Sequence, residues 1–394
     1  MTKTIAILGS TGSIGKTLLK IIKKNESSFK IVLLTANNDY KTLYSQAKKY
    51  KVKNLIIKNL ICYEILKKKC KQTNINVYNN FDIFNKVFKK KVDYTMNSIV
   101  GFDGLKPTLN IIKFSKQIAL ANKESIICGW NLIKKKSIKH KTKIIPVDSE
   151  HFSIWSSLNK LNININHNLN KKIQKIFITA SGGPFLKTPL KDFNKINIKQ
   201  ATKHPTWKMG NKISIDSATL VNKLFEVVEA QRIFNLNIDK IGIKIHPQSY
   251  MQSIINFKNG LIKICAHETD MSVPILNSLD KNLNYMSNKK INFKILNNLD
   301  LSDIDKKKFP VINILNNYPN YCSLFDTALV STNDELVSLF LKKKISFNDI
   351  FKNLLKILNL RSIKKLKKIQ PKNLKEIIEI NNFVRLKTRN VSIV

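Results

Sequence analysis

The chain has 394 residues, of which 43% are hydrophobic, so it is long enough for two or three domains that each bury a core. No apolar run approaches the roughly 20 residues of a membrane-spanning helix, which excludes a helical membrane protein. The net charge of +43 points to polyanions, yet only four of the 69 basic residues are arginine, the residue that makes bidentate contacts with phosphates and bases.

Lysine is spread along the whole chain beside many isoleucines and asparagines, so we interpret the charge as a compositional bias without a specific nucleic-acid partner. A basic nucleic-acid-binding protein is the non-enzymatic alternative, and it predicts tight, sequence-selective binding at physiological salt. The five cysteines are scattered and never spaced C-x-x-C, which is typical of a reducing cytoplasm and not of disulfides or a zinc site. The first residues enter a strand pattern and leave no room for a secretory signal, so we expect a cytoplasmic protein.

The N-terminal part alternates short apolar runs with a helical pattern. Residues 3–10 and 29–36 have the pattern of buried strands, and residues 14–24 between them have the spacing of a helix. Further strands are expected at residues 52–59, 92–100, 116–123 and 141–150. This alternation predicts a Rossmann-like α/β domain with a parallel, doubly wound sheet.

The first expected strand is followed by a glycine-rich turn, GSTGSIGKT. Gly9, Gly12 and Gly15 let the backbone turn tightly, and the start of the next helix offers N–H donors, which suits a bound phosphate. The spacing is looser than the dinucleotide fingerprint, so a plain strand-to-helix turn stays open. A P-loop is the other nucleotide alternative, but Ser10 stands where its first glycine belongs, and Pro146 interrupts the strand that would carry its acid.

The end of the second expected strand reads TANND, where a dinucleotide would place its adenosine ribose. An acid at this place favours NAD and a basic residue favours NADP. Asp39 is the only charged side chain in the segment, and it lies somewhat late. The segment by itself leaves the choice between the two cofactors open.

Two acids follow the strand expected at residues 141–150. Asp148 ends an apolar run, and Glu150 comes after a single serine. In an extended segment, residues two apart point to the same side, so we expect both carboxylates to project together from the strand end. Because such acids repel each other, a divalent cation with oxygen ligands, Mg²⁺ or Mn²⁺, is favoured there. The alternative is a solvated strand end with capping acids.

A second polar group lies on an expected helix that begins near Ala218, with Asp216 or Ser217 as its cap. Three residues share one face of that helix: Asn222, Lys223 and Glu226. A cation, an amide and an acid beside a hydroxyl form a surface suited to phosphate and metal. The alternative is an ordinary salt bridge on a solvated helix face.

Three further polar residues lie at strand ends or in loops. Ser181 follows an expected strand in the flexible segment ASGGPF and suits an anionic oxygen. His204 lies in a loop with Trp207 that can close over a substrate, although a lone loop histidine is more often structural. Lys123 ends another expected strand, where its amine can orient a carbonyl or a phosphate.

The rest of the chain indicates further parts. Residues 159–172 are polar and low in complexity, which predicts a solvated loop, and the lysine-rich part from about residue 345 has helical spacing. We expect a Rossmann-like domain over residues 1–150, an α+β catalytic domain over 151–290, a linker over 291–310 and a small all-α domain over 311–394.

Six segments, in this order, resemble the 1-deoxy-D-xylulose 5-phosphate reductoisomerase family: ILGSTGSIG, ALANKES, PVDSEH, ASGGPF, HPTWKMGNKISIDSATLVNK and IHPQS. They run from residue 5 to about 250, and the helical tail also suits the family. The resemblance implies a homodimer that isomerises 1-deoxy-D-xylulose 5-phosphate and reduces the product with NADPH to 2-C-methyl-D-erythritol 4-phosphate, an isoprenoid precursor. Another metal-assisted, nicotinamide-dependent reductase of a phosphorylated sugar is the alternative enzyme.

The resemblance also implies roles for single residues. The ligands of Mg²⁺ or Mn²⁺ would be Asp148, Glu150 and Glu226. The substrate would be bound by Lys123, Ser149, Glu150, Ser181, His204, Ser217, Asn222, Lys223 and Glu226, with catalytic roles for Lys123, Glu150, His204 and Glu226. The cofactor would contact Thr11, Gly12, Ser13, Ile14, Asn37, Asn38, Asp39, Asn122, Glu124 and Gly210.

Two segments depart from the family pattern. The family commonly has glycine, a basic or small polar residue and then asparagine where this chain has Asn37, Asn38 and Asp39. This difference weakens the case for 2′-phosphate recognition and leaves NADPH against NADH open. Residues 267–282 lack the arginines expected nearby, and we expect this segment to serve dimer or domain packing.

Overall fold

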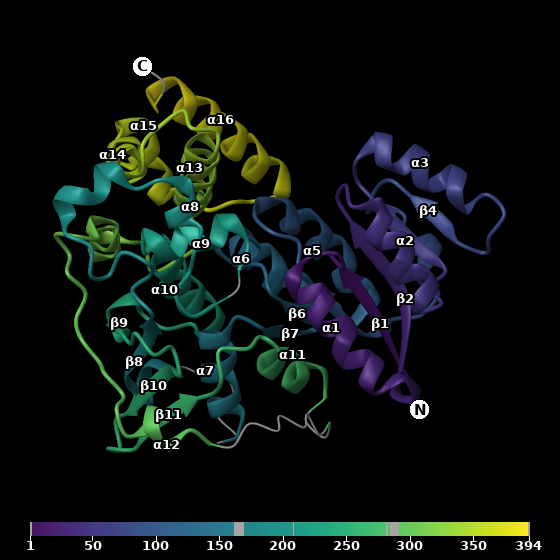
Figure 1. The fold of residues 1–394 in the computed structure, drawn as a ribbon, viewed down its shortest axis with the longest axis horizontal. Coiled ribbons are helices and arrows are strands. Elements are labelled where there is room, and N and C mark those ends of the chain that lie inside the picture. Colours follow the sequence, from purple (N-terminus) through teal and green to yellow (C-terminus); the bar gives the residue numbers. More distant parts are fainter. Residues whose placement is uncertain (1, 161–168, 208, 281–282, 284–290, 393–394) are drawn as a thin grey trace. The chain divides into compact units, whose positions relative to one another are not determined.

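The computed structural model describes residues 2–160, 169–207, 209–280, 283 and 291–392, which form two compact units (Figure 1). Unit 1 consists of Met1–Ser125, Leu132–Asp148 and Met271–Tyr285, and unit 2 consists of Ile126–Asn131, Ser149–Asp270 and Met286–Val394. The chain therefore passes between the units several times. This division concerns compactness, and the functional domain boundaries expected at residues 150, 290 and 310 stay a prediction.

Unit 1 is built on a sheet of seven strands in the order β4-β3-β2-β1-β5-β6-β7, with all neighbouring pairs parallel. The strands are β1 (Lys3–Leu8), β2 (Phe29–Ala36), β3 (Asn54–Ile57), β4 (Asn76–Tyr78), β5 (Val92–Asn97), β6 (Ser115–Leu120) and β7 (Lys143–Pro146). Six of them confirm the strands expected from apolar runs, whereas the short β4 was missed. Ile5, Ile7 and Leu8 on the central β1 are fully buried, as a strand covered on both faces requires.

Helices connect these strands and supply the apolar cover of the sheet. They are α1 (Ser13–Lys24), α2 (Tyr40–Lys49), α3 (Leu60–Cys70), α4 (Phe84–Val87), α5 (Leu105–Ile111) and the outer parts of α6 (Lys123–Lys139). A late helix, α11 (Ser272–Leu279), joins the same unit, where Ile275 and Leu276 share one buried cluster with Leu18 and Ile22 of α1. Packing by residues 267–282 is thus confirmed for α11.

Unit 2 contains a four-stranded sheet in the order β11-β10-β8-β9. Its strands are β8 (Ile173–Ala180), β9 (Ile241–Ile245), β10 (Met251–Phe257) and β11 (Ile262–Ala266). β8 and β9 are parallel, and β10 is antiparallel to both of its neighbours. Two helices pack on this sheet, α7 (Ser149–Lys160) on β10 and β11 and α10 (Val221–Phe234) on β8 and β9. These two helices carry most of the polar residues of the site.

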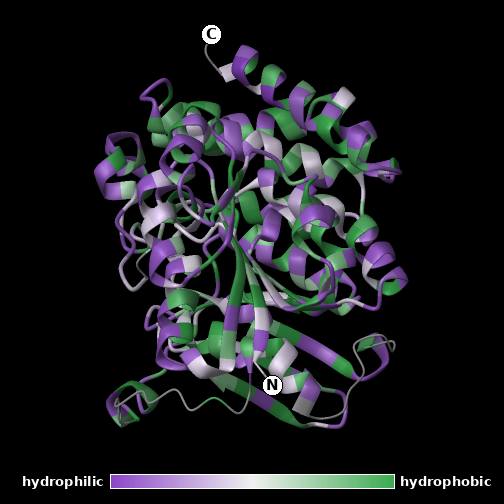
Figure 2. Ribbon diagram, turned by 90° about the vertical axis from the view of Figure 1, so that its right-hand side faces the viewer, coloured by the Kyte–Doolittle hydropathy of each residue, from purple (hydrophilic) through white to green (hydrophobic). Residues whose placement is uncertain are grey.

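The last part of unit 2 is helical, as its spacing predicts. It contains α13 (Leu324–Leu341), α14 (Phe347–Leu358), α15 (Arg361–Lys364) and α16 (Leu374–Ser392). The ring of Phe347 packs edge-on against Phe340 and Phe351, with centroids 5.8 and 5.6 Å apart. Hydrophobic and hydrophilic stretches alternate along the final helix (Figure 2), which is typical of a helix with one face on a core. The expected fold class, with Rossmann-like, α+β and small all-α parts, is confirmed.

Shorter helices complete the described chain: α8 (Ile198–Ala201), α9 (Asn211–Ala218) and α12 (Phe293–Leu296). Among the described residues, none of the helices is both long and apolar enough to cross a bilayer. Most of the loop expected at residues 159–172 lies outside the described residues, and Leu169–Lys171 form a short 3₁₀ helix.

The extended geometry expected for residues 148–150 is wrong. β7 ends at Pro146 and α7 begins at Ser149, so Glu150 lies in the first turn of a helix. Serine and aspartate before a helix, and glutamate in its first turn, are favoured because they accept hydrogen bonds from N–H groups and complement the dipole. β7 is an edge strand, where a terminal proline is tolerated.

The start expected for the next polar helix is also wrong. α10 begins at Val221, and Asp216 and Ser217 lie inside the preceding α9, so neither of them caps α10. Leu220 turns the chain between the two helices with a left-handed φ of 57°. A leucine rarely adopts this conformation, so no sequence signal announces the turn.

Candidate active site

Two carboxylates and one ammonium form a buried group in unit 2. Glu150 lies in the first turn of α7, and Lys223 and Glu226 lie three residues apart on α10. The Lys223 Nζ atom is 2.6 Å from Glu150 Oε1 and 2.5 Å from Glu226 Oε2. None of the three residues is more than 9% exposed, so the solvated salt bridge considered from the sequence is wrong.

The charges within this group stabilise one another. Burial by itself lowers the pKa of Lys223, but the carboxylates of Glu150 and Glu226 outweigh it and raise that pKa above its ordinary value. Lys223 therefore stays charged and offsets one of the two negative charges. Asn222 Nδ2 donates to Glu226 Oε1 at 2.5 Å, and Ser149 Oγ donates to Glu150 Oε2 at 2.5 Å. Five residues expected at the site are thus brought together.

The third acid adjoins this group along the chain. Asp148 is the last residue of its segment in unit 1, and a peptide bond joins it to Ser149. Carboxylate oxygens of Asp148, Glu150 and Glu226 all lie within 4.8 Å of one another. This oxygen-only donor set fits a hard cation such as Mg²⁺ or Mn²⁺ better than zinc. Lys123 Nζ, at the start of α6, is 3.0 Å from Asp148 Oδ2.

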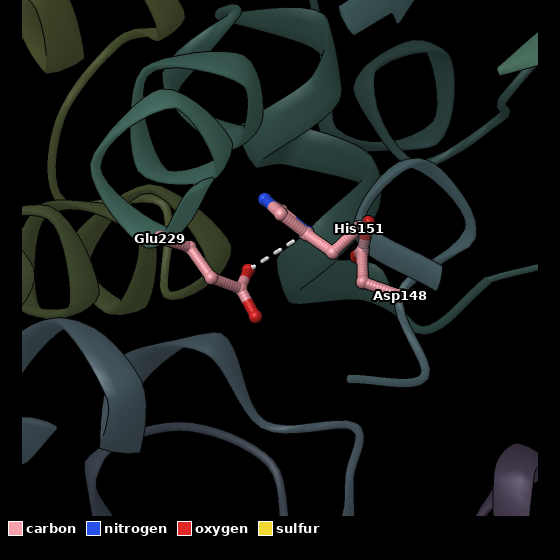
Figure 3. A group of neighbouring side chains, drawn as sticks. All are labelled: Asp148, His151 and Glu229. Carbon is pink, nitrogen blue, oxygen red and sulfur yellow. Dashed lines mark ion pairs between the residues drawn. The ribbon is translucent and has the colours of Figure 1, made fainter. Parts of the chain in front are cut away.

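A buried histidine and a further glutamate lie beside these acids (Figure 3). His151 Nδ1 is 3.3 Å from Glu229 Oε2, and His151 Nε2 is 2.8 Å from the backbone oxygen of Glu226. Because a carbonyl oxygen only accepts, Nε2 carries a proton. Neither residue has a role predicted from the sequence, although Glu229 follows Glu226 by three positions on one helix, a spacing that places both on one face.

A second polar group in unit 2 is centred on a histidine. His204 Nε2 is 3.0 Å from Ser181 Oγ and 3.1 Å from Ser217 Oγ. Its Nδ1 accepts the backbone N–H groups of Thr206 and Trp207 at 3.2 and 3.0 Å, so the proton of the neutral ring lies on Nε2 and faces the hydroxyls. Burial, with a smaller effect of Lys223, lowers the pKa of His204 to about 4, so the ring is neutral at pH 7.

Two glycines allow the strand end that carries Ser181 to approach α9. Gly182 and Gly183 have left-handed φ values of 81° and 67°. A Cβ atom at Gly183 would lie 2.8 Å from the backbone oxygen of Ser217. Only glycine permits this approach, which brings the Ser181 and Ser217 hydroxyls to the same imidazole.

The glycine-rich turn of unit 1 connects β1 to α1, as expected. Gly9 has a φ of 84°, and a Cβ atom at Gly15 would lie 2.5 Å from the backbone oxygen of Gly9. The turn therefore needs glycine at both positions. It leaves residues 11–14 at the turn and the first residues of α1, where backbone N–H groups suit a phosphate. The Ser10 hydroxyl, at the position where a P-loop needs glycine, is buried and bonded to the Gln46 side chain.

The side chains of two expected cofactor residues, Asp39 and Asn122, cap helices of unit 1. Asp39 Oδ1 accepts the Thr42 N–H at 3.0 Å and caps α2. Asn122 Oδ1 accepts the Ser125 N–H at 2.7 Å and caps α6, while its Nδ2 donates to the Ile99 and Gly101 carbonyls. Besides residues 11–14, the remaining expected contacts are Asn37 and Asn38 after β2, Glu124 in the first turn of α6, and Gly210 at the N-cap of α9 in unit 2.

Three family models match the chain. A model of 1-deoxy-D-xylulose 5-phosphate reductoisomerase matches residues 5–129, and two models of its C-terminal domains match residues 144–234 and 267–387. The 1-deoxy-D-xylulose 5-phosphate reductoisomerase of Pelagibacter ubique is 53% identical over 394 residues, which are 99% of this chain and 100% of that protein. The protein of the same name from a Wolbachia of Drosophila simulans is 36% identical over 351 residues, 88% of each chain.

Solved structures are similar over the same length. The 1-deoxy-D-xylulose 5-phosphate reductoisomerase of Zymomonas mobilis in complex with NADPH has a TM-score of 0.85 and 30% identity, covering 99% of this chain and 98% of that one. DOX-P reductoisomerase in complex with NADPH, fosmidomycin and magnesium has a TM-score of 0.89 and 29% identity, covering 99% and 97%.

Proposed function

The chain belongs to the 1-deoxy-D-xylulose 5-phosphate reductoisomerase family, and we propose that the group of Glu150, Lys223 and Glu226 is the centre of its active site. The enzyme isomerises 1-deoxy-D-xylulose 5-phosphate and reduces the product to 2-C-methyl-D-erythritol 4-phosphate, a step towards isoprenoids. It uses NADPH and Mg²⁺. The observation that carries this conclusion is the 53% identity over the full length of a relative.

We assign Asp148, Glu150 and Glu226 as the metal ligands, supported by their convergent oxygens. When bound, the metal supplies positive charge that stabilises negative charge developing on substrate oxygens. Mn²⁺ prefers similar ligands, and we propose that it can replace Mg²⁺. Lys223 offsets part of the negative charge of this group, which reduces the repulsion between the Glu150 and Glu226 carboxylates.

We assign the substrate's phosphate to the group around His204, with Asn222 and Lys223. The neutral ring presents Nε2–H, and the hydroxyls of Ser181 and Ser217 can turn their protons towards an anion. Lys123 and Ser149, which bond to Asp148 and Glu150, are assigned to the reacting end of the substrate. Catalytic roles are proposed for Lys123, Glu150, His204 and Glu226.

For the cofactor, we assign the pyrophosphate to residues 11–14, supported by the uncapped helix start that follows Gly12. Asn37, Asn38 and Asp39 follow β2, at the strand end where the ribose phosphate of such folds is bound. The Asp39 carboxylate is engaged by a backbone N–H of α2, which reduces its repulsion of a 2′-phosphate. Asn122, Glu124 and Gly210 complete the proposed contacts.

At the level of domains, we propose that residues 1–150 bind the cofactor and residues 151–290 carry the catalytic site. Residues 291–310 would link this part to the helical domain of residues 311–394. A cytoplasmic location is proposed from the five scattered cysteines, whose spacing is typical of a reducing compartment.

A homodimer is proposed from the edge of the unit 2 sheet. β11 is an edge strand, and its Ile262 and Ile264 are each 58% exposed, so a second copy that covers them removes apolar surface from water. Light scattering should give twice the chain mass, and Ile264→Lys should shift the protein towards the monomer because it buries a charge in that contact. A wild-type mass of one chain contradicts the dimer.

The proposed function is tested with purified protein, 1-deoxy-D-xylulose 5-phosphate, Mg²⁺ and either NADPH or NADH. We expect substrate-dependent oxidation of NADPH that stops when a chelator removes Mg²⁺, and a weaker reaction with NADH. Substrate-independent oxidation, or reduction of other sugar phosphates only, would instead favour another metal-assisted reductase.

A further inference from the structure

Besides the Glu150–Lys223 ion pair, a buried hydrogen bond of a histidine joins the two helices that carry the site's carboxylates. His151, which follows Glu150 in α7, is fully buried, and its Nε2 donates to the backbone carbonyl of Glu226 at 2.8 Å. This hydrogen bond therefore links His151, the neighbour of Glu150, to the backbone of Glu226.

Glu229 contacts the other nitrogen of the same ring, Nδ1. Figure 3 shows the two side chains directed towards each other, with Glu229 Oε2 3.3 Å from His151 Nδ1 and only 1% of the Glu229 side chain exposed. Phe234 stacks on the ring with its centroid 6.5 Å away and the planes at 20°. A polar and an apolar partner on α10 thus define the orientation of the imidazole.

We propose that His151 and Glu229 are a positioning pair that sets the distance between the Glu150 and Glu226 carboxylates for a divalent cation. The proposal rests on the proposed function, in which these carboxylates bind Mg²⁺. The pair itself does not contact the substrate; it acts through α7 and α10.

The physical reason is the cost of a buried polar atom without a partner. If Glu229 lost its carboxylate, Nδ1 of a fully buried ring would face apolar groups in place of a carboxylate 3.3 Å away, and the ring would turn towards another polar partner. A turned ring releases the Glu226 carbonyl, so the first turn of α7 loses one of its buried contacts with α10. Groups that orient metal ligands in this way typically change metal affinity by about 10- to 100-fold.

A second metal site is the competing interpretation. Ligand atoms of Asp148, His151 and Glu229 also lie within 4.8 Å of one another. However, His151 Nε2 already donates to a carbonyl, and Nδ1 lies 3.3 Å from the Glu229 carboxylate, so a cation bound there would have to separate these two side chains. A metal held there predicts two cations per chain, which binding stoichiometry detects.

The test measures Mn²⁺ binding to the full chain without substrate, from the electron paramagnetic resonance signal of unbound Mn²⁺. Glu229→Leu keeps volume but removes the polar partner, and we expect the affinity to fall about 10- to 100-fold. Glu229→Gln supplies an amide that can donate to Nδ1, and we expect it to restore the affinity to within about threefold of wild type. The Mg²⁺ concentration for half-maximal activity should rise in Glu229→Leu, while kcat at saturating Mg²⁺ changes little.

Asp326→Asn is the matched control. It also removes the charge of a buried carboxylate of unit 2, but the partner of that carboxylate is Arg232 and not a residue of α7. It should lower the melting temperature and leave Mn²⁺ affinity unchanged. If Glu229→Leu does not fold, His151→Asn replaces it: the shorter amide keeps a polar group near Glu229 and loses the donor to Glu226, so Mn²⁺ affinity should fall similarly.

Three results would overturn the positioning pair. They are wild-type Mn²⁺ affinity in a folded Glu229→Leu or His151→Asn variant, an equal loss in Asp326→Asn, and two Mn²⁺ ions per wild-type chain with one lost in Glu229→Leu. In each case, activity of the wild-type enzyme would still support the proposed function. A wild-type chain that neither binds Mn²⁺ nor reduces the substrate overturns both.

Discussion

Lys223 shows how the charges of single residues are balanced only after folding. Its ammonium lies between Glu226, three residues along the same helix, and Glu150, 73 residues earlier in the chain. Helical spacing predicts the first of these partners. The second depends on two helices packing on one sheet, so no local pattern announces it.

Glu226→Gln tests the carboxylates at this scale. The amide keeps the size of the side chain but removes one negative charge from the proposed ligands. Turnover should therefore fall at least about 100-fold, and the Mg²⁺ concentration for half-maximal activity should rise. NADPH absorbance measures both, and thermal unfolding checks the fold. Glu379→Gln on the exposed face of α16 is the control and should change neither quantity. Normal turnover and normal metal response in Glu226→Gln contradict the assignment.

His204 makes the stability of the enzyme depend on pH. Burial lowers its pKa from 6.5 to about 4 in the folded chain, so between these values the unfolded chain binds the extra proton. Its contribution to the free energy of unfolding is therefore present above pH 6.5 and is lost as the pH falls towards 4. The urea midpoint should fall less over this range in His204→Gln, which keeps a donor but does not titrate. Equal slopes in both proteins contradict a half-buried histidine that stays neutral.

At the scale of elements, α10 serves the site and the helical part of unit 2 at once. Its first turns carry Lys223 and Glu226, and near its end Arg232 donates to both carboxylate oxygens of Asp326 on α13 at 3.1 and 2.9 Å. Asp326 also accepts from the Tyr318 hydroxyl and from the Ser323 N–H. The C-terminal helices therefore fix the end of the helix whose beginning holds the proposed metal ligands.

Asp326→Asn measures this connection. Removing one partner of a buried pair leaves the Arg232 guanidinium without its counter-charge, so we expect a loss of about 3 kcal/mol or more in the free energy of unfolding, measured with urea. Asp303→Asn is the control, because the Asp303 side chain is 85% exposed and pairs with Lys244 at the surface. That change should cost at most about 1 kcal/mol. Similar losses in both variants contradict a structural role for the buried pair.

At the scale of the whole molecule, the charge of +43 hides a selective use of arginine. Three of the four arginines are held by carboxylates of the helical part: Arg232 by Asp326, Arg385 by Asp334 and Glu335, and Arg389 by Glu335. These three arginines thus stand where a planar, two-pronged donor is needed, and lysine supplies all but one of the remaining basic residues. This distribution supports a compositional origin of the charge.

Nucleic-acid binding provides the corresponding test. We expect weak binding of duplex DNA at about 50 mM salt that falls steeply by about 200 mM, with the same affinity for unrelated sequences, because only lysine–phosphate contacts contribute. Fluorescence anisotropy with two unrelated labelled duplexes measures this. Tight, sequence-selective binding at physiological salt would favour the nucleic-acid alternative.

The sequence by itself determined the features that depend on short-range patterns. Apolar runs marked six strands of the parallel sheet, the glycines of residues 9–15 marked the turn after β1, and helical spacing marked the C-terminal helices and the shared face of Asn222 and Glu226. These features are local because a strand, a turn or a helix face is specified by residues a few positions apart.

Only the tertiary structure decided which distant residues meet. It brought Glu150 to Lys223, His151 to Glu229, and α11 to α1. It also placed Glu150 in a helix turn instead of an extended segment. Such contacts follow from how helices pack on sheets, where burial selects among many possible pairings, and the local spacing of residues does not contain that choice.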